Sequence, residues 1–190
     1  MNIVSFGCGY DTTFFWLNEL SDQRAGFSVS DLRANLCFTE VDYDKVVNQK
    51  IEIINRNPQK LRTHINLESD QDGNPSSLSE YEINTSNYKL FAHNICDTQG
   101  MSEVLKNKFN VKGDIPTLVL TECLLIYLRP EHAQGVLKWI GSYFSGSPFV
   151  GVANYEMINP HDTFGRKMVD NLVDRGCELL GIHACDSLAS

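Results

Sequence analysis

Two glycines and an acidic residue lie close together near the start of the chain. Residues 7–13 read Gly-Cys-Gly-Tyr-Asp-Thr-Thr and follow directly on the apolar run Ile3–Phe6. Glycines at such a place allow a sharp turn and a close approach of the backbone to a ligand. A Gly-x-Gly turn alone is weak evidence, because a plain strand-to-helix connection uses the same residues. We therefore consider Gly7, Gly9 and Asp11 together with the acids that follow.

A second acid lies at the end of the next apolar run, where Glu-Val-Asp ends at Asp42. It comes about 30 residues after the glycines, near the spacing at which nucleotide-binding folds place an acid on the ribose hydroxyls. A dinucleotide is second choice, because a Thr at position 12 replaces the third glycine that its pyrophosphate needs. S-adenosylmethionine carries a sulfonium cation and no phosphate. It suits the acidic pocket that Asp11, Asp42, Asp97 and Glu122 would form at strand ends.

Two further segments carry polar groups just after apolar runs. Asn94-Ile95-Cys96-Asp97 follows the third main run, where a side chain and a backbone amide can meet an adenine ring. Glu122 lies in the apolar stretch 121–127, where an unpaired acid would be costly to bury, so it needs a ligand or a basic partner. Tyr127 points either into the same crevice or into the core. We find no catalytic triad and no metal-ligand spacing of histidines, so we assign no catalytic residue and no metal.

Alternating apolar runs and amphipathic stretches position these residues. The strands are expected at Ile3–Phe6, Leu36–Val41, Lys89–His93, Thr117–Thr121 and Phe149–Ala153. Helices are expected to begin at Thr12 or Thr13, which would cap the first, at Asp44, at Met101, at Pro130, and at Pro160 or Asp162. This alternation predicts an α/β, doubly wound parallel sheet in a single domain, 1–190, with ligands at the carboxyl ends of its strands. The Ser- and Asn-rich stretch 68–87 is expected to be a surface loop within it.

Composition and charge exclude some classes of protein. The net charge is −8 and the pI is near 5.0, which argues against a nucleic-acid surface. No apolar stretch approaches the roughly 20 residues of a membrane span, and the N-terminus has no basic-then-apolar signal. The six cysteines include no Cys-x-x-Cys pair, which favours a reducing compartment. We expect a cytoplasmic protein, a monomer, that binds neither nucleic acid nor membranes.

The motifs together resemble one family, the leucine carboxyl methyltransferases. Residues 7–14 are similar to its G-x-G-x-D-T-T-F turn, and residues 40–43 to its E-V-D followed by an aromatic. Residues 116–131 resemble its P-T-L, E-C-x-L-x-Y and P-E segment, and residues 154–179 continue the likeness in the same order. The resemblance thus covers nearly the whole chain. It implies a Rossmann-like, S-adenosylmethionine-dependent methyltransferase fold, truncated at both ends, because family members have a helical section before the first strand and further strands after the last.

The resemblance also implies roles for residues. Gly7 and its turn, with Gly9 and Asp11, would lie along the methionine part of S-adenosylmethionine, and Asp42 would hold the ribose. Asn94 and Ile95 would meet the adenine, with Asp97 beside them, and Glu122 would line the pocket. The family usually reads Asp-Leu-Arg-Asp where this chain has residues 94–97, so we expect weaker adenine binding.

The implied substrate is the C-terminal leucine carboxylate of a protein phosphatase 2A-type catalytic subunit. Its tail carboxylate, with a pKa near ~3.5, is already ionised, so no general base is needed. Tyr127, Arg129 and Arg166 are candidates to contact it. Three alternatives remain open: a relative of the transfer-RNA wybutosine methyltransferases, a non-catalytic cofactor-binding module, and a structural α/β domain with an empty crevice.

Overall fold

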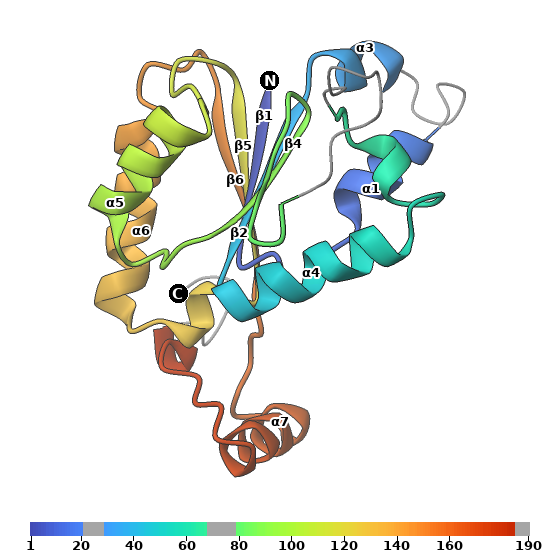
Figure 1. The fold of residues 1–190 in the computed structure, drawn as a ribbon. Helices are drawn as coiled ribbons and strands as arrows, with labels where there is room; N and C mark the ends of the chain where they lie inside the picture. The colour runs from blue at the N-terminus through green and yellow to red at the C-terminus, as the bar shows by residue number, and fades with distance from the viewer. Residues whose placement is uncertain (21–28, 68–78, 185–190) are drawn as a thin grey trace.

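A computed structural model describes residues 1–20, 29–67 and 79–184 (Figure 1). Within these residues six strands form one sheet in the order β3-β4-β2-β1-β5-β6. The strands are β1 (Asn2–Phe6), β2 (Cys37–Asp42), β3 (Ile83–Asn84), β4 (Tyr88–Ala92), β5 (Thr117–Glu122) and β6 (Val150–Tyr155). Every pairing is parallel except that of β3 with β4. The expected α/β, Rossmann-like architecture is confirmed, and the five predicted strands are present within one or two residues at each end.

Helices cover the sheet on both faces, as Figure 1 shows. The longer ones are α1 (Thr13–Glu19), α3 (Val29–Ala34), α4 (Asp44–Arg56), α5 (Thr98–Glu103), α6 (Pro130–Tyr143) and α7 (Thr163–Asp174). The π-helical turn η2 (Val104–Lys108) continues α5, and three-residue 3-10 turns are η1 (Arg62–His64), η3 (Leu125–Tyr127) and η4 (Ile182–Ala184). The sequence did not indicate α3, because six residues are too few to show helical periodicity. No helix of the described part is both long and apolar enough to cross a membrane.

Two apolar clusters hold the layers together. On one face, Val4, Phe6 and Val119 of the strands pack against Met101 of α5 and Ile140 of α6. On the other face, α1 and α4 pack over β1, β2 and β4, and this cluster includes Phe14, Phe38, Val47, Ile51, Tyr88 and Leu90. Both clusters follow from the alternation of side chains along parallel strands that are buried on both faces.

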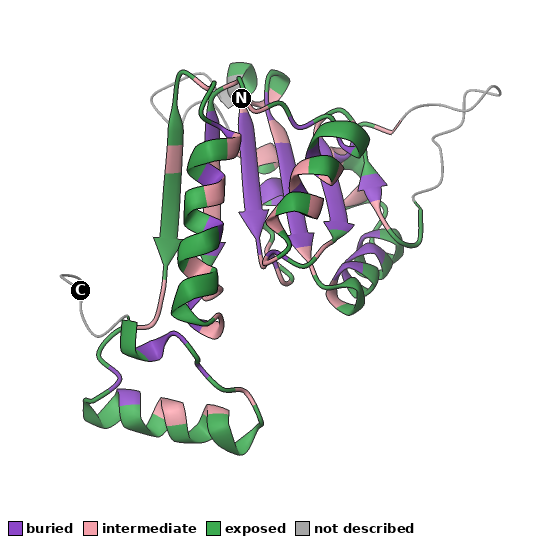
Figure 2. Cartoon of the chain, turned by 90° about the vertical axis from the view of Figure 1, so that its left-hand side faces the viewer, coloured by how far each residue is buried: buried purple, intermediate pink, exposed green. Residues whose placement is uncertain are grey.

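Strand β6 differs from the other parallel strands because it is exposed at five of its six residues. Val152 is 45% exposed and Tyr155 is 69% exposed. In Figure 2 it stands out in green beside the purple central strands. The sequence predicted a buried strand here. The strand is exposed because α1 and α4 cover β1, β2 and β4, and because no described strand pairs with its outer edge.

The predicted surface loop 68–87 needs one correction. Residues 68–78 lie outside the described part of the chain. Ile83–Asn84 forms the short strand β3, and Ile83 is buried in the cluster beneath α4. A single apolar side chain in a polar stretch is enough to anchor this edge strand, although it produces no periodic signal.

The glycines of α6 and α7 should respond in opposite ways to alanine. A Cβ on Gly165, in the first turn of α7, would lie 2.3 Å from the carbonyl oxygen of Asn159, whereas a Cβ on Gly135 in α6 meets nothing within 4 Å. We expect Gly135→Ala to stabilise the protein by about 0.5–1 kcal/mol through helix propensity. Gly165→Ala should destabilise it by roughly 1–3 kcal/mol, because the backbone must move. Urea unfolding of both variants checks this, and equal stabilities would contradict the packing of α7.

Candidate functional site

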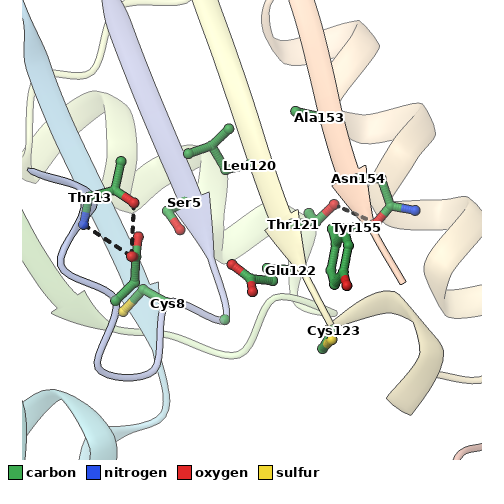
Figure 3. A pocket seen from close by; sticks show the side chains of 12 residues that line it. Ser5, Cys8, Thr13, Leu120, Thr121, Glu122, Cys123, Ala153, Asn154 and Tyr155 are labelled. Atoms are coloured by element: carbon green, nitrogen blue, oxygen red, sulfur yellow. Dashed lines mark hydrogen bonds between the residues drawn. The ribbon is translucent and has the colours of Figure 1, made fainter. Parts of the chain in front are cut away.

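A cavity lies where β1, β5 and β6 end (Figure 3). Its volume is about 520 Å³, within the range of small-molecule sites. It is lined by Ser5, Gly7, Cys8, Asp11, Thr13, Leu120, Thr121, Glu122, Cys123, Ala153, Asn154 and Tyr155. The strand order runs outward from β1 toward β2 and β4 on one side and toward β5 and β6 on the other. The cavity therefore lies at the point where the strand order reverses, where open α/β sheets bind ligands.

The turn after β1 forms one wall of the cavity and depends on its two glycines. Gly7 has φ +66° and Gly9 has φ +50°, in the left-handed region that favours glycine. The backbone N–H of Gly7 donates to the carbonyl of Val41 at 2.8 Å, which extends the pairing of β1 with β2 into the turn. A Cβ on Gly7 would lie 2.7 Å from Cδ1 of Leu124, while one on Gly9 meets nothing within 4 Å.

Asp42 holds this turn from the neighbouring strand. Its Oδ2 accepts from the backbone N–H of Gly9 at 2.7 Å, and its Oδ1 accepts from the N–H of Tyr43 at 2.7 Å. The carboxylate thus lies at the end of β2, directly beside the turn, although it is not among the residues lining the cavity. Each of its oxygens retains a lone pair with which to accept from a ligand hydroxyl.

Asp11 has two roles in the structure: it lines the cavity, and its side chain binds the first residue of α1. Its Oδ1 accepts from the backbone N–H of Thr13 at 3.0 Å and from the Thr13 hydroxyl at 2.8 Å. Thr12 occupies the N-cap position of α1 but makes no capping hydrogen bond through its side chain. The prediction that Thr12 and Thr13 cap this helix was therefore wrong. The side chain of Asp11, one residue before Thr12, accepts the hydrogen bond from the backbone N–H of Thr13 instead.

Glu122 is exposed at the end of β5 and lines the cavity. The expectation that it would be buried in the apolar run around it was therefore wrong, and its contact with a cofactor stays a prediction. It is paired in register with Tyr155 at the end of β6, and Figure 3 shows both side chains beside Cys123. Cys123 itself has φ +46°, so the chain turns sharply directly after Glu122. This turn leads into η3 and keeps the carboxylate of Glu122 at the cavity instead of inside the apolar run around it.

The 94–97 loop contributes no side chain to the cavity lining. The carbonyl oxygen of the Asn94 side chain accepts from the N–H of Cys96 at 3.0 Å, and Ile95 is 7% exposed in the apolar core. Asp97 caps α5 by accepting from the N–H of Gly100 at 3.0 Å. The loop nevertheless begins beside Asp42, since the N–H of His93 donates to the Asp42 carbonyl at 3.0 Å. The adenine contacts of Asn94 and Ile95 stay predictions.

The three candidate substrate residues are not brought into the cavity lining. Tyr127 lies half-buried in η3, where burial raises the pKa of its hydroxyl. Arg129 is exposed just before α6, and Arg166 is exposed on α7. α7 packs through Met168, Val169 and Leu172 onto Ile126 of η3, so Tyr127 and Arg166 belong to neighbouring elements. Their role in holding a substrate stays a prediction.

Glu156 is a site residue to which the sequence assigned no role. Its Oε1 accepts from the backbone N–H groups of Leu124 at 3.2 Å and Leu125 at 2.8 Å, and so ties the end of β6 to the turn after Glu122. Its Oε2 is buried and accepts no hydrogen bond within the described chain. Burial raises the pKa of Glu156, although these backbone amides lower it in part. The predicted strand ended at Ala153, three residues before Glu156. Only the observed end of β6 at Tyr155 gives Glu156 a place like that of Asp42 and Glu122 at the end of a strand.

The charges around the cavity are negative. Asp11 and Glu122 line it, and the lining includes no Lys, Arg or His. Burial raises the pKa of the Cys8 thiol, and the nearby carboxylates of Glu40, Asp42 and Asp11 raise it further, so this cysteine is a neutral packing group. The described residues contain no group of three or more His, Cys, Asp or Glu placed to hold a metal ion. The cavity is suited to a ligand with a positive charge.

Alanine at the two turn glycines provides a matched pair. Both variants force a non-glycine residue into the left-handed region, which costs about 1–2 kcal/mol. Gly7→Ala must in addition displace Leu124, so we expect it to cost roughly 1 kcal/mol more than Gly9→Ala. Chemical denaturation measures the difference. A Gly9→Ala variant that is the less stable of the two would contradict the close approach of Gly7 to Leu124.

Glu156 should make stability depend on pH. Because its pKa in the folded state lies above the ordinary value of 4.5, its contribution is fully present below about that pH and is lost as the pH rises through the raised pKa. Glu156→Gln keeps an acceptor for the two amides but cannot ionise. As the pH rises above about 5, the melting temperature of the natural protein should fall relative to that of Glu156→Gln. A difference that stays constant with pH would mean that Glu156 titrates normally.

Comparison with known proteins gives the family. The sequence model of the family described as "Leucine carboxyl methyltransferase" matches residues 1–141. The chain is 32% identical over 188 residues to leucine carboxyl methyltransferase 1 of Rattus norvegicus, with 99% of this chain and 51% of the relative aligned. It is 32% identical over 186 residues to the leucine carboxyl methyltransferase 1 homolog of Arabidopsis thaliana, with 98% of this chain and 50% of the relative aligned.

A third relative is leucine carboxyl methyltransferase 1 of Caenorhabditis elegans, 30% identical over 188 residues, with 97% of this chain and 50% of the relative aligned. The chain therefore spans about half the length of the curated relatives it matches. The family match covers β1 through most of α6, including the glycine turn, Asp42 and Glu122. The chain belongs to the leucine carboxyl methyltransferase family.

Proposed function

We propose that this chain binds S-adenosylmethionine and forms the cofactor-binding core of an enzyme that methylates the C-terminal leucine carboxylate of a phosphatase 2A-type catalytic subunit. The observation that carries the proposal is the acidic cavity at the carboxyl ends of β1, β5 and β6, walled by a glycine turn. The family name of the relatives supports the reaction, methyl transfer to a leucine carboxyl group. Free cysteines at positions 8, 37, 96, 123 and 177 are compatible with the reducing cytoplasm as its place of action.

The residues of the cavity fit this cofactor. S-adenosylmethionine supplies an activated methyl group next to a sulfonium cation. The carboxylates of Asp11 and Glu122 favour that charge. Asp42, which accepts from the Gly9 amide beside the cavity, would accept from the ribose hydroxyls. The backbone at Gly7 and Gly9 carries no side chain that would keep the ligand away from the wall. Asn94 and Ile95 would meet the adenine beside Asp42.

The chemistry asked of the protein is positioning. A C-terminal carboxylate has a pKa of ~3.5 and is ionised at neutral pH, so no residue has to remove a proton. The protein must place one carboxylate oxygen in line with the methyl group and exclude water. A cation should steady the incoming carboxylate, because the cavity lining is acidic. Arg129 and Arg166 are the proposed candidates, Arg129 through its place just after η3 and Arg166 through the packing of α7 on η3.

A second candidate function is a cofactor-binding module that does not transfer methyl groups. The exposed β6 favours it, because a reaction cavity open along a strand admits water. Both candidate functions require binding of S-adenosylmethionine. They differ in methyl transfer, which the second half of the experiment below measures.

Calorimetric titration should show binding of S-adenosylmethionine that depends on charge. Glu122→Gln removes one carboxylate from the cavity and should weaken S-adenosylmethionine binding by roughly 5–10-fold. The loss should be smaller for S-adenosylhomocysteine, because this thioether lacks the sulfonium charge. Asp170→Asn, an equal charge change on the exposed part of α7, is the matched control and should leave both affinities within about twofold. The absence of any binding by the natural chain would rule out the cofactor.

Methyl transfer is the second half of the same experiment. The acceptor is a phosphatase catalytic subunit with its terminal leucine, compared with the same subunit lacking that residue. Transfer only to the first supports the proposed enzyme. Binding without transfer supports the module.

A further inference from the structure

A buried ionic cluster lies directly behind the glycine turn, outside the cavity lining. Lys50 of α4 and Glu40 of β2 form an ion pair, with Nζ and Oε2 at 2.6 Å, and their side chains are 4% and 0% exposed. The hydroxyl of Tyr88, on β4, donates to the same Oε2 of Glu40. All three residues belong to the layer in which α4 packs on β2 and β4.

This cluster is costly to bury. Desolvation raises the pKa of Glu40 even though Lys50 and Tyr88 lower it in part, and its Oε1 accepts no hydrogen bond from the described residues. Buried ion pairs often contribute no more stability than apolar residues of the same volume. We therefore ask whether this ion pair positions a neighbouring segment of the chain.

Lys50 makes a second contact, and this one is with the glycine turn. Its Nζ also donates to the backbone carbonyl of Asp11 at 2.7 Å. The same residue, Asp11, presents its carboxylate to the cavity and accepts from Thr13 at the start of α1. Its backbone N–H closes the turn by donating to the carbonyl of Cys8 at 2.9 Å. Lys50 thus connects α4 and β2 to the middle of the turn, as Asp42 connects β2 to Gly9.

We propose that Lys50 is a positioning residue: held by Glu40, it fixes the carbonyl of Asp11, and with it the turn whose glycines and carboxylate face the ligand. The identity of that ligand rests on the proposed function, whereas the hold on the turn is a property of the ligand-free chain. Tyr88 donates to Glu40 and stacks on Phe14, and no hydrogen bond between Tyr88 and residues 7–13 is seen among the described residues.

Hydrogen exchange in the ligand-free protein tests the hold directly. In Lys50→Met the backbone amides of Gly9, Asp11 and Thr13 should exchange about 10-fold faster or more than in the natural protein. Amides of the same chain in the centre of α6 serve as the internal reference for global stability.

Two control variants separate this effect from general destabilisation. Lys89→Met removes another buried lysine, which donates to the carbonyl of Thr85 at 2.9 Å and to Asn84, near β3 and far along the sheet from the cavity. Tyr88→Phe removes a donor to Glu40 but keeps the ring that stacks on Phe14. Neither should speed exchange in the turn beyond the rise seen in α6. Turn amides that exchange no faster in Lys50→Met than in Lys89→Met would overturn the proposal.

Lys50→Met leaves the Glu40 carboxylate buried without its cation and is the variant most exposed to misfolding. The double variant Lys50→Met/Glu40→Gln removes both charges and still lacks the contact with Asp11. It should show the same fast exchange in the turn, and normal exchange there would equally overturn the proposal.

Cofactor binding distinguishes this inference from the proposed function. S-adenosylmethionine affinity should fall about 10-fold in the double variant and stay within about twofold in Lys89→Met, because only the first loosens the turn. If the natural protein binds no S-adenosylmethionine, the proposed function fails, while the exchange result still decides the role of Lys50. If affinity is unchanged while the turn exchanges faster, the turn does not position the ligand and Lys50 has only a structural role.

Discussion

Parallel pairing of β1 with a strand on each side is the constraint on which the rest of the structure depends. Phe6, at its end, is opposite Val41 of β2 and Thr121 of β5. Because all three strands run the same way, the glycine turn, Asp42 and Glu122 must all emerge at one edge of the sheet. One residue of slip in either pairing would turn Val4 and Phe6 out of the core and separate these groups.

Groups from neighbouring elements hold the turn after β1 by hydrogen bonds to its backbone. The backbone carbonyl of Val41 on β2 accepts a hydrogen bond from the N–H of Gly7, and the side chain of Asp42 accepts one from the N–H of Gly9. Lys50 donates a hydrogen bond to the backbone carbonyl of Asp11. A turn in left-handed conformation would otherwise sample other states, since glycine loses more backbone freedom on folding than other residues. Preorganisation of this kind lets binding energy go to the ligand instead of to the ordering of the loop.

The cavity is well built on the side of β1 and open on the side of β6. Ser5, Leu120 and Ala153 form its floor from neighbouring strands, yet β6 is exposed along nearly its whole length. Methyl transfer requires that the acceptor be gripped and water be kept out. For the proposed function, the described residues would hold a cofactor from the side of β1, and the cavity lining offers no cationic side chain to an acceptor carboxylate.

The order of the five parallel strands, and of the helices between them other than α3, was readable from the sequence, because buried parallel strands are short apolar runs and their covering helices carry one apolar face. The prediction that Gly7, Asp11 and Glu122 lie near one another rested on a related reason, since residues that follow such runs lie at one edge of the sheet, and all three line the cavity. Only the tertiary structure decided which of these side chains line the cavity. Ile95 went into the core, Asp97 became a helix cap, and Glu156 and Lys50 gained contacts with residues more than 30 positions away. Such contacts depend on the three-dimensional packing of α4, β2 and β6, which local periodicity does not record.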